Sequence, residues 1–251
     1  MSLEKIQSVY EALGRDDPLW AILTDDRFRG NKWDPGEFFR TGQTEIEEVF
    51  SDLEAHRMDP RRGCAVDFGC GVGRLTQALC ARFESVIGVD ISSTMIDRAM
   101  KWNQFGDRCR YLLNTSDALI GIADGSVDFV YSNISLQHNP PRYQVRYMQE
   151  FLRVLRPGGL AAFQVRIGPH RPEGSMSERW YRLKSETLRP AYKRLRGRPA
   201  VQAHTVSEQD VQAAVGTRGT ILYSVNTDRR PRASRQSLRY VIQKLEPDRR
   251  S

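Results

Sequence analysis

Three glycines at alternate positions, Gly69, Gly71 and Gly73, separate an apolar run at residues 64–68 from a segment with helical spacing at 74–82. Glycine reaches positive φ values and lets other groups approach the backbone closely. The first N–H groups of a helix behind such a turn have no partner inside the helix. The segment therefore predicts a strand, a tight turn and a helix that together cradle a ligand at the carboxyl end of a sheet.

Strands and helices are expected to alternate beyond this turn. Helical spacing predicts helices at residues 92–102 and from 139 to the turn at 157–159. Short apolar runs predict further strands at residues 85–90, 110–113, 128–133, 160–165, 220–225 and 238–243. This alternation favours an α/β fold in which helices cover both faces of a mostly parallel sheet.

The segments around this core have their own character. Residues 1–60 are expected to form a helical cap, with Asp34 as an N-cap before Pro35 and a capping box at 44–47. Residues 166–204 are interpreted as a basic insertion or lid on a core at 63–165. Residues 205–243 are interpreted as a closing helix and strands, with a second capping box at 205–208. The chain, 1–251, is then a single domain.

Composition restricts the class of protein. A hydrophobic fraction of 39% and a charged fraction of 27% are typical of soluble globular chains. The N-terminus lacks the apolar core of a signal peptide, and no apolar run approaches the roughly 18 residues of a membrane span. We therefore expect a cytoplasmic protein. The four cysteines form no CxxC pair, so no metal is expected.

The charge is uneven along the chain. Residues 166–251 hold 19 Lys and Arg against 8 Asp and Glu, whereas the residues before them are slightly acidic. Such a half either attracts an anionic partner or is only a solvated surface. Arg166, Arg171, Arg179 and Arg182 are candidates for recognising an anionic acceptor, beside Trp180 and Tyr181.

A carboxylate on the second strand indicates the class of ligand. Asp90 ends that strand seventeen residues after Gly73, where a carboxylate can accept hydrogen bonds from both hydroxyls of a ribose. A dinucleotide fingerprint would need the pattern G-x-G-x-x-G. The sixth position is Arg74 counted from Gly69 and Thr76 counted from Gly71, so the pattern favours a nucleoside cofactor other than NAD.

The arrangement D-x-G-x-G-x-G from Asp67 to Gly73 resembles motif I of the class I S-adenosylmethionine (SAM)-dependent methyltransferases. Further segments resemble later steps of that family in the same order: residues 86–92, 116–118, 127–133 and 152–159. The resemblance covers residues 63–165 closely and 205–243 loosely. It implies a three-layer sandwich with a seven-stranded, mostly parallel sheet whose last strand is antiparallel.

The resemblance also implies a role for each matching residue. Asp67 would orient the glycine turn, whose three glycines would lie under the methionine and ribose of SAM. Asp90 would hold the ribose, Ile91 would lie along the adenine, and Asp117 and Ala118 would face its edge. Asn133 would lie beside the reacting methyl group. Arg40 and Gly42 resemble a segment that caps the methionine end of SAM, where Arg40 would pair with a carboxylate.

The expected reaction is transfer of the SAM methyl group to a small molecule, with S-adenosylhomocysteine (SAH) as product. A hydroxyl acceptor needs a general base, and His138, after the fourth strand, is the best-placed histidine; it is also read as a residue that only precedes a helix. Residues 139–142 resemble an N-P-P-Y/F motif but begin six residues after Asn133, so a capped helix start is favoured.

Two other functions stay open at this point. The basic half would suit an RNA or protein methyltransferase, although no RNA-binding module is present and nucleic acid is not the expected partner. The second open function is that of a SAM-binding partner protein that catalyses no reaction. The residues do not indicate the acceptor, the choice among O-, N- and C-methylation, or the oligomeric state.

Overall fold

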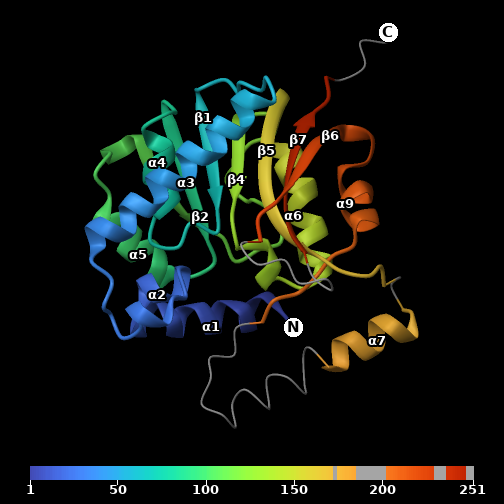
Figure 1. Ribbon diagram of the computed structural model, residues 1–251, viewed down its shortest axis with the longest axis horizontal. Helices are drawn as coiled ribbons and strands as arrows, with labels where there is room; N and C mark the ends of the chain where they lie inside the picture. The colour runs from blue at the N-terminus through green and yellow to red at the C-terminus, as the bar shows by residue number, and fades with distance from the viewer. Residues whose placement is uncertain (172–173, 185–201, 229–235, 247–251) are drawn as a thin grey trace.

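The computed structural model describes residues 1–171, 174–184, 202–228 and 236–246. Its centre is one seven-stranded sheet in the order β3-β2-β1-β4-β5-β7-β6 (Figure 1). Strands β1 to β5 are parallel, and β7 runs antiparallel to both β5 and β6. The strands are β1 Cys64–Phe68, β2 Ser85–Asp90, β3 Cys109–Leu113, β4 Val127–Ser132, β5 Leu155–Ile167, β6 Gly219–Asn226 and β7 Gln236–Lys244. The predicted α/β sandwich with an antiparallel last strand is confirmed.

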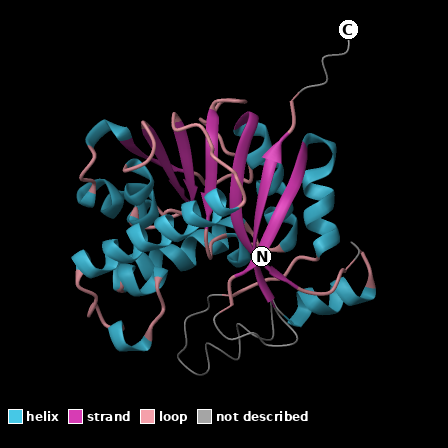
Figure 2. Ribbon diagram, turned by 45° about the horizontal axis from the view of Figure 1, so that its top comes forward, coloured by secondary structure: helices cyan, strands magenta, loops and turns pink. Residues whose placement is uncertain are grey.

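Helices cover both faces of this sheet (Figure 2). α3 and α4 pack on one face, and α6 and α9 pack on the other. α1 and α2 lie below the sheet in Figure 1, at the carboxyl ends of the parallel strands. The helices are α1 Leu3–Asp16, α2 Pro18–Ile22, α3 Pro35–Ala55, α4 Arg74–Cys80, α5 Ser93–Trp102, α6 Pro141–Val154, α7 Met176–Arg182 and α9 Glu208–Val215. The 3-10 turns are η1 Asp26–Phe28, η2 Gly106–Arg108, η3 Leu136–His138 and η5 Gly216–Arg218.

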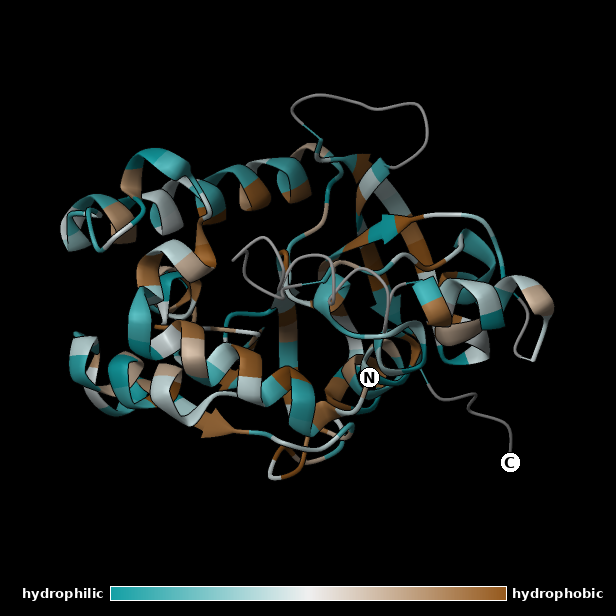
Figure 3. Cartoon of the chain, turned by 90° about the horizontal axis from the view of Figure 1, so that it is seen from below, coloured by the Kyte–Doolittle hydropathy of each residue, from teal (hydrophilic) through white to brown (hydrophobic). Residues whose placement is uncertain are grey.

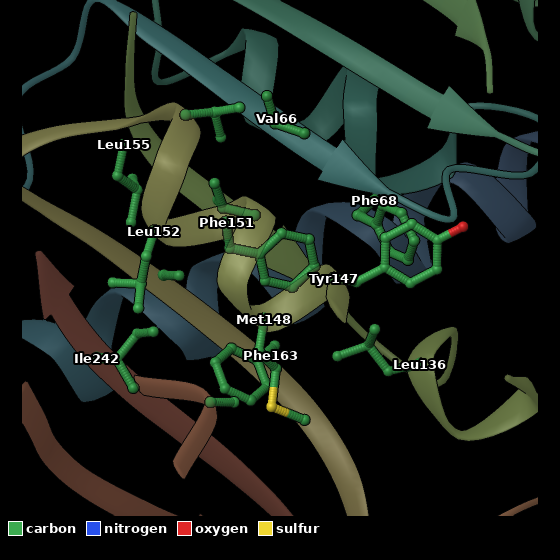
Figure 4. Close-up of a cluster of buried hydrophobic side chains, with 14 of the residues drawn as sticks. Val66, Phe68, Leu136, Tyr147, Met148, Phe151, Leu152, Leu155, Phe163 and Ile242 are labelled. Atoms are coloured by element: carbon green, nitrogen blue, oxygen red, sulfur yellow. The ribbon is translucent and has the colours of Figure 1, made fainter. Parts of the chain in front are cut away.

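The larger core lies between the sheet and α6 (Figure 4). Phe68, at the end of β1, packs against Tyr147 and Phe151 of α6, with ring centroids 4.5 and 5.3 Å apart. Aromatic pairs at these distances add to the free energy gained from burial. This packing fixes the end of β1, from which the glycine turn begins.

The helices are amphipathic, as the alternating hydrophilic and hydrophobic turns in Figure 3 show from below. In α3, residues Ile46, Val49, Phe50 and Leu53 are buried at the spacing of one helix face. No helix within the described ranges is both long and apolar enough to cross a membrane.

Both predicted capping boxes are wrong in position. Asp34 does cap α3, accepting a hydrogen bond from the Glu37 N–H at 2.8 Å, so residues 44–47 lie in the middle of a helix that continues to Ala55. At the second site the N-cap is Ser207, which exchanges hydrogen bonds with Asp210. A residue can cap only where the backbone enters the helix. Val206 still forms a β-bridge with Ile167, so the helix cannot begin until after it.

The end of α6 also differs from the prediction. The helix ends at Val154, and residues 157–159 lie inside β5 rather than in a turn. Leu155 already pairs with Val127, and a register shift follows in the ladder between β4 and β5. The proline and glycines thus occupy an irregular stretch of a strand. The same residue types are typical of turns, which explains the wrong prediction. Of the predicted lid, residues 172–173 and 185–201 lie outside the described part of the chain.

Candidate active site

A cleft opens at the carboxyl ends of β1, β2 and β4, with about 790 Å³ of empty space that is partly open to solvent. The sheet side supplies Phe68, Gly69, Gly71, Val89, Asp90, Ile91, Met95, Asn114, Asn133, Ile134, Ser135, His138, Asn139 and Tyr147. Ile6, Tyr10, Ala21 and Ile22 close it from α1 and α2.

The glycine turn is built as expected from its sequence. Gly69, Gly71 and Gly73 have φ values of 77°, 54° and 87°, a region that other residues rarely adopt. A side chain at Gly69 would overlap Ser135, and one at Gly71 would come within 2.5 Å of the Ile22 side chain. Gly69 and Gly71 therefore line the cleft with bare backbone, against which Ser135 and Ile22 pack closely. Gly73 instead packs against Tyr111, outside the cleft lining.

Asp90 joins the glycine turn to the start of α5. One carboxylate oxygen accepts the Gly71 N–H at 2.8 Å, and the other accepts the Ser92 N–H at 2.9 Å. Burial raises the pKa of Asp90, and these backbone hydrogen bonds oppose the rise. Each oxygen of a carboxylate has two lone pairs, so each can still accept a hydroxyl from the cleft.

Asp67 lies behind the turn rather than in the cleft lining. Its side chain is buried and accepts a hydrogen bond from the Thr76 hydroxyl at 2.7 Å. The other carboxylate oxygen has no partner among the described residues. Burial raises the pKa of Asp67 to about 7, although the Thr76 hydrogen bond and the charge of Arg74 lower it. Asp67 thus supports the turn from below.

Glu45, which sequence reasoning missed, connects α3 to the sheet under the cleft. It accepts hydrogen bonds from Arg74 at 2.7 Å, Tyr131 at 2.9 Å and Asn133 at 2.6 Å. Charge-assisted hydrogen bonds of this kind are stronger than neutral ones. Glu45 therefore fixes the amide of Asn133, a predicted site residue that does line the cleft.

Arg40 and Gly42 lie away from the cleft. The Arg40 side chain is 66% exposed, and its guanidinium is 4.0 Å from the Glu37 carboxylate. A side chain at Gly42 would come within 2.5 Å of the Arg74 carbonyl oxygen. Gly42 therefore allows α3 and α4 to approach closely, which is a packing role.

Two of the three predicted adenine contacts, Asp117 and Ala118, are also outside the cleft lining. Asp117 is exposed, and the Ala118 N–H donates to the Ser116 hydroxyl at 3.2 Å. Asn114, which was not predicted, lines the cleft instead and donates to the Ser116 carbonyl at 3.0 Å. Ile91 lines the cleft as expected.

The chain after β4 forms the other wall of the cleft. Ile134 has a φ of 59°, a strained value for a β-branched residue, and its N–H donates to the buried Gln164 side chain at 3.0 Å. His138 lines the cleft, and its Nδ1 is 2.8 Å from the Gln202 carbonyl oxygen. A carbonyl only accepts, so Nδ1 carries the hydrogen of this hydrogen bond.

The candidate cationic residues do not line this cleft within the described ranges. Arg171 stacks on the Tyr181 ring at 4.2 Å and donates to the Thr205 hydroxyl at 3.2 Å. Arg166 and Arg179 also lie outside the lining, Trp180 is 61% exposed on α7, and the Arg182 side chain is outside the described residues.

Comparisons with known proteins agree with this geometry. Residues 66–163 match a family model described as a methyltransferase domain. Malonyl-acyl-carrier-protein O-methyltransferase 1 of Coxiella burnetii is 31% identical over 49% of this chain and 39% of that protein. The enzyme of the same description from Enterobacter lignolyticus is 28% identical over 80% of this chain and 81% of that protein. The chain spans less than half the length of the first two curated relatives it matches, 39% and 44%.

Solved structures share the fold over nearly the whole chain. Magnesium protoporphyrin IX methyltransferase from Synechocystis, with bound SAH, gives a TM-score of 0.61 at 19% identity, covering 96% of this chain and 99% of that one. Geranyl diphosphate C-methyltransferase from Streptomyces coelicolor gives 0.60 at 15% identity, covering 97% of each chain.

Proposed function

Because the chain contains a methyltransferase domain of the class I, SAM-dependent fold family, we propose that it transfers a methyl group from SAM to an oxygen atom of a small molecule. Several relatives are named O-methyltransferases, which supports oxygen as the acceptor atom. The cleft at the carboxyl ends of β1, β2 and β4 is the proposed site of both ligands.

The residues of the cleft fit SAM. Gly69 and Gly71 line the cleft with bare backbone, and this lets Ser135 and Ile22, which also line it, pack directly against the turn. Asp90 retains acceptor capacity for ribose hydroxyls after its two backbone hydrogen bonds. When bound, SAM supplies a methyl group on a positively charged sulfur, which is an activated leaving group. The chain's own residues then have to hold both partners in line and exclude water.

The observation that carries the proposed chemistry is the orientation of His138. Its Nδ1–H bond to the Gln202 carbonyl assigns that hydrogen to Nδ1, so Nε2 is the ring nitrogen that would act as the general base. In the mechanism that we propose, Nε2 accepts the proton of an acceptor hydroxyl as the oxygen takes the methyl group. Asn133 and Ser135, on the same wall, are available to orient the acceptor.

The substitutions His138→Ala and His138→Gln test this role. We expect turnover to fall by about 100-fold or more, the range usual for loss of a general base. Affinity for SAH, measured by calorimetry, should stay within a factor of two. The acceptor is first identified by incubating the protein with labelled SAM and a metabolite extract. His56→Ala is the matched control, since His56 lies on α3's C-cap, away from the cleft. Near-normal turnover in both His138 variants would remove this residue from the mechanism.

A further inference from the structure

Tyr10, in the middle of α1, carries a buried hydroxyl that lines the cleft. Its oxygen is inaccessible to solvent and has no hydrogen-bond partner among the residues that the structure describes. A buried hydroxyl without a partner costs free energy, so native proteins rarely keep one. Each such group therefore needs an explanation, and a ligand can supply the missing partner of a residue that, like Tyr10, lines the proposed cofactor cleft.

The position of Tyr10 is fixed by the neighbouring turns of α1. Glu11 accepts hydrogen bonds from the N–H groups of Ser93 and Thr94, at 2.6 and 3.2 Å, and so fastens α1 to the start of α5. Ile6, one turn earlier, is 3% exposed. The hydroxyl is therefore held where it lies by packing on both sides, and its lack of a partner is not a consequence of a loose helix.

Asp90 lines the same cleft as Tyr10. Burial raises the pKa of Tyr10, and the negative charge of Asp90 raises it further, so the two groups are within electrostatic reach. They are not hydrogen-bonded to each other, and the two Asp90 oxygens each accept one backbone N–H. Both residues line the cleft, so a ligand group that reaches the buried Tyr10 oxygen would lie close to the Asp90 carboxylate.

We propose that Tyr10 is a cofactor-binding residue whose hydroxyl, together with the Asp90 carboxylate, holds one ribose hydroxyl of SAM from two sides. This inference rests on the proposed function. The ribose hydroxyl donates its hydrogen to Asp90 and accepts one from Tyr10, which satisfies all three groups. α1 is then part of the cofactor site rather than only a cover over it.

The ring of Tyr10 has a separate contact that the test must preserve. It packs edge-on against the His138 ring, with centroids 5.9 Å apart and an interplanar angle of 65°. Tyr10→Phe keeps this contact and removes only the hydroxyl, whereas Tyr10→Ala would remove both. Tyr10→Phe is therefore the informative variant.

The experiment measures SAH binding and the stability of the ligand-free protein for Tyr10→Phe. Loss of one neutral hydrogen bond should weaken SAH binding about 5-fold. The melting temperature without ligand should be unchanged or higher, because a buried hydroxyl without a partner has been removed. The matched control is Tyr223→Phe, whose hydroxyl donates to Asp52 at 3.0 Å away from the cleft. It should lower the melting temperature and leave SAH affinity unchanged.

Analogues of SAH that lack the 2′- or the 3′-hydroxyl identify the partner atom. One of these two analogues should lack the hydroxyl that Tyr10 contacts. The wild type and Tyr10→Phe should bind that analogue with equal affinity. Equal SAH binding by wild type and Tyr10→Phe overturns the inference and leaves the proposed function standing. The inference is also overturned if Tyr10→Phe binds both analogues more weakly than the wild type does, or if the ligand-free variant has a lower melting temperature. Failure of the wild type to bind SAH would overturn the proposed function as well.

Discussion

Asp67 and Asp90 come from neighbouring parallel strands and have different surroundings. Asp90 faces the cleft and accepts two backbone N–H groups, whereas Asp67 is buried below the turn with one oxygen that has no partner in the described chain. An ionised carboxylate in such a place is destabilising unless hydrogen bonds or charges compensate for burial. Burial raises the pKa of both carboxyl groups, but only Asp67 combines this with an oxygen that lacks a partner in the described chain.

Asp67 should make the ligand-free protein less stable as the pH rises. Its pKa is raised by burial from 3.8 to about 7, so its contribution to stability is fully present below pH 3.8 and is lost as the pH rises through 7. Between pH 5 and 8 the loss amounts to about 2 kcal/mol. Asp67→Asn should remove this part of the pH dependence. Urea unfolding of both proteins at pH 5 and pH 8 measures it, and identical pH slopes would contradict the prediction.

Ile134 stores backbone strain at the wall of the cleft. A β-branched residue at a φ of 59° is held there by the hydrogen bond to Gln164 and by the chain on either side. Glycine accepts this conformation without strain. Ile134→Gly should therefore be neutral or stabilise the protein by up to about 1 kcal/mol, whereas Ile134→Ala keeps the strain and should destabilise it. Thermal unfolding of the two variants separates these effects, and equal destabilisation by both would show that there is no strain.

Part of the cleft could be predicted from the sequence at the level of single residues. Gly69, Gly71, Asp90, Asn133 and His138 line it, and each lies at the end of a strand or in the turn that follows. Such positions meet at one edge of a parallel sheet whatever the rest of the chain does. Tyr10 and Ile22 enter the cleft only because α1 and α2 dock there, and no local pattern records that contact.

At the level of elements, strands were easier to predict than helix ends. β1 and β2 match their predicted bounds, since a buried parallel strand is a short apolar run with distinct ends. The ends of β5 and α6 were not predicted, because the irregular pairing of β4 with β5 determines them. The helical character of residues 1–60 was foreseen, but the position of α1 against the carboxyl edge of the sheet was not.

The docking of α1 depends on the charge of Glu11. Burial alone would raise the pKa of Glu11, but hydrogen bonds from Thr94 and Ser93 outweigh it and lower the pKa below 4.5. The stability that Glu11 contributes is present above pH 4.5 and is lost as the pH falls below that value. Glu11→Gln should cost about 0.5–1 kcal/mol at pH 7, since the group is partly exposed.

Hydrogen exchange of the α1 amides measures this effect. Exchange in Glu11→Gln should be faster than in the wild type at pH 7, and the difference should shrink as the pH is lowered through 4.5. Glu4→Gln is the control, because Glu4 is exposed in the first turn of the same helix. A similar effect of both variants would mean that Glu11 has no special role.

At the scale of the whole molecule, the charge of the cleft differs from the charge of the chain. The net charge is +7, yet the described residues that line the cleft include Asp90 and neither lysine nor arginine. A pyrophosphate would meet a carboxylate and no cation there, whereas a sulfonium nucleoside is positively charged. The electrostatics of the cleft therefore agree with the family in favouring SAM over a dinucleotide.

Titration calorimetry with SAH and with NAD tests the central claim most directly. We expect one SAH molecule to bind per chain, with no heat above dilution for NAD. SAH at 100 times its dissociation constant should stabilise the fold by about 2.7 kcal/mol. Asp90→Ala should abolish the heat of SAH binding. Clear binding of NAD by a protein that gives no heat with SAH would contradict the account.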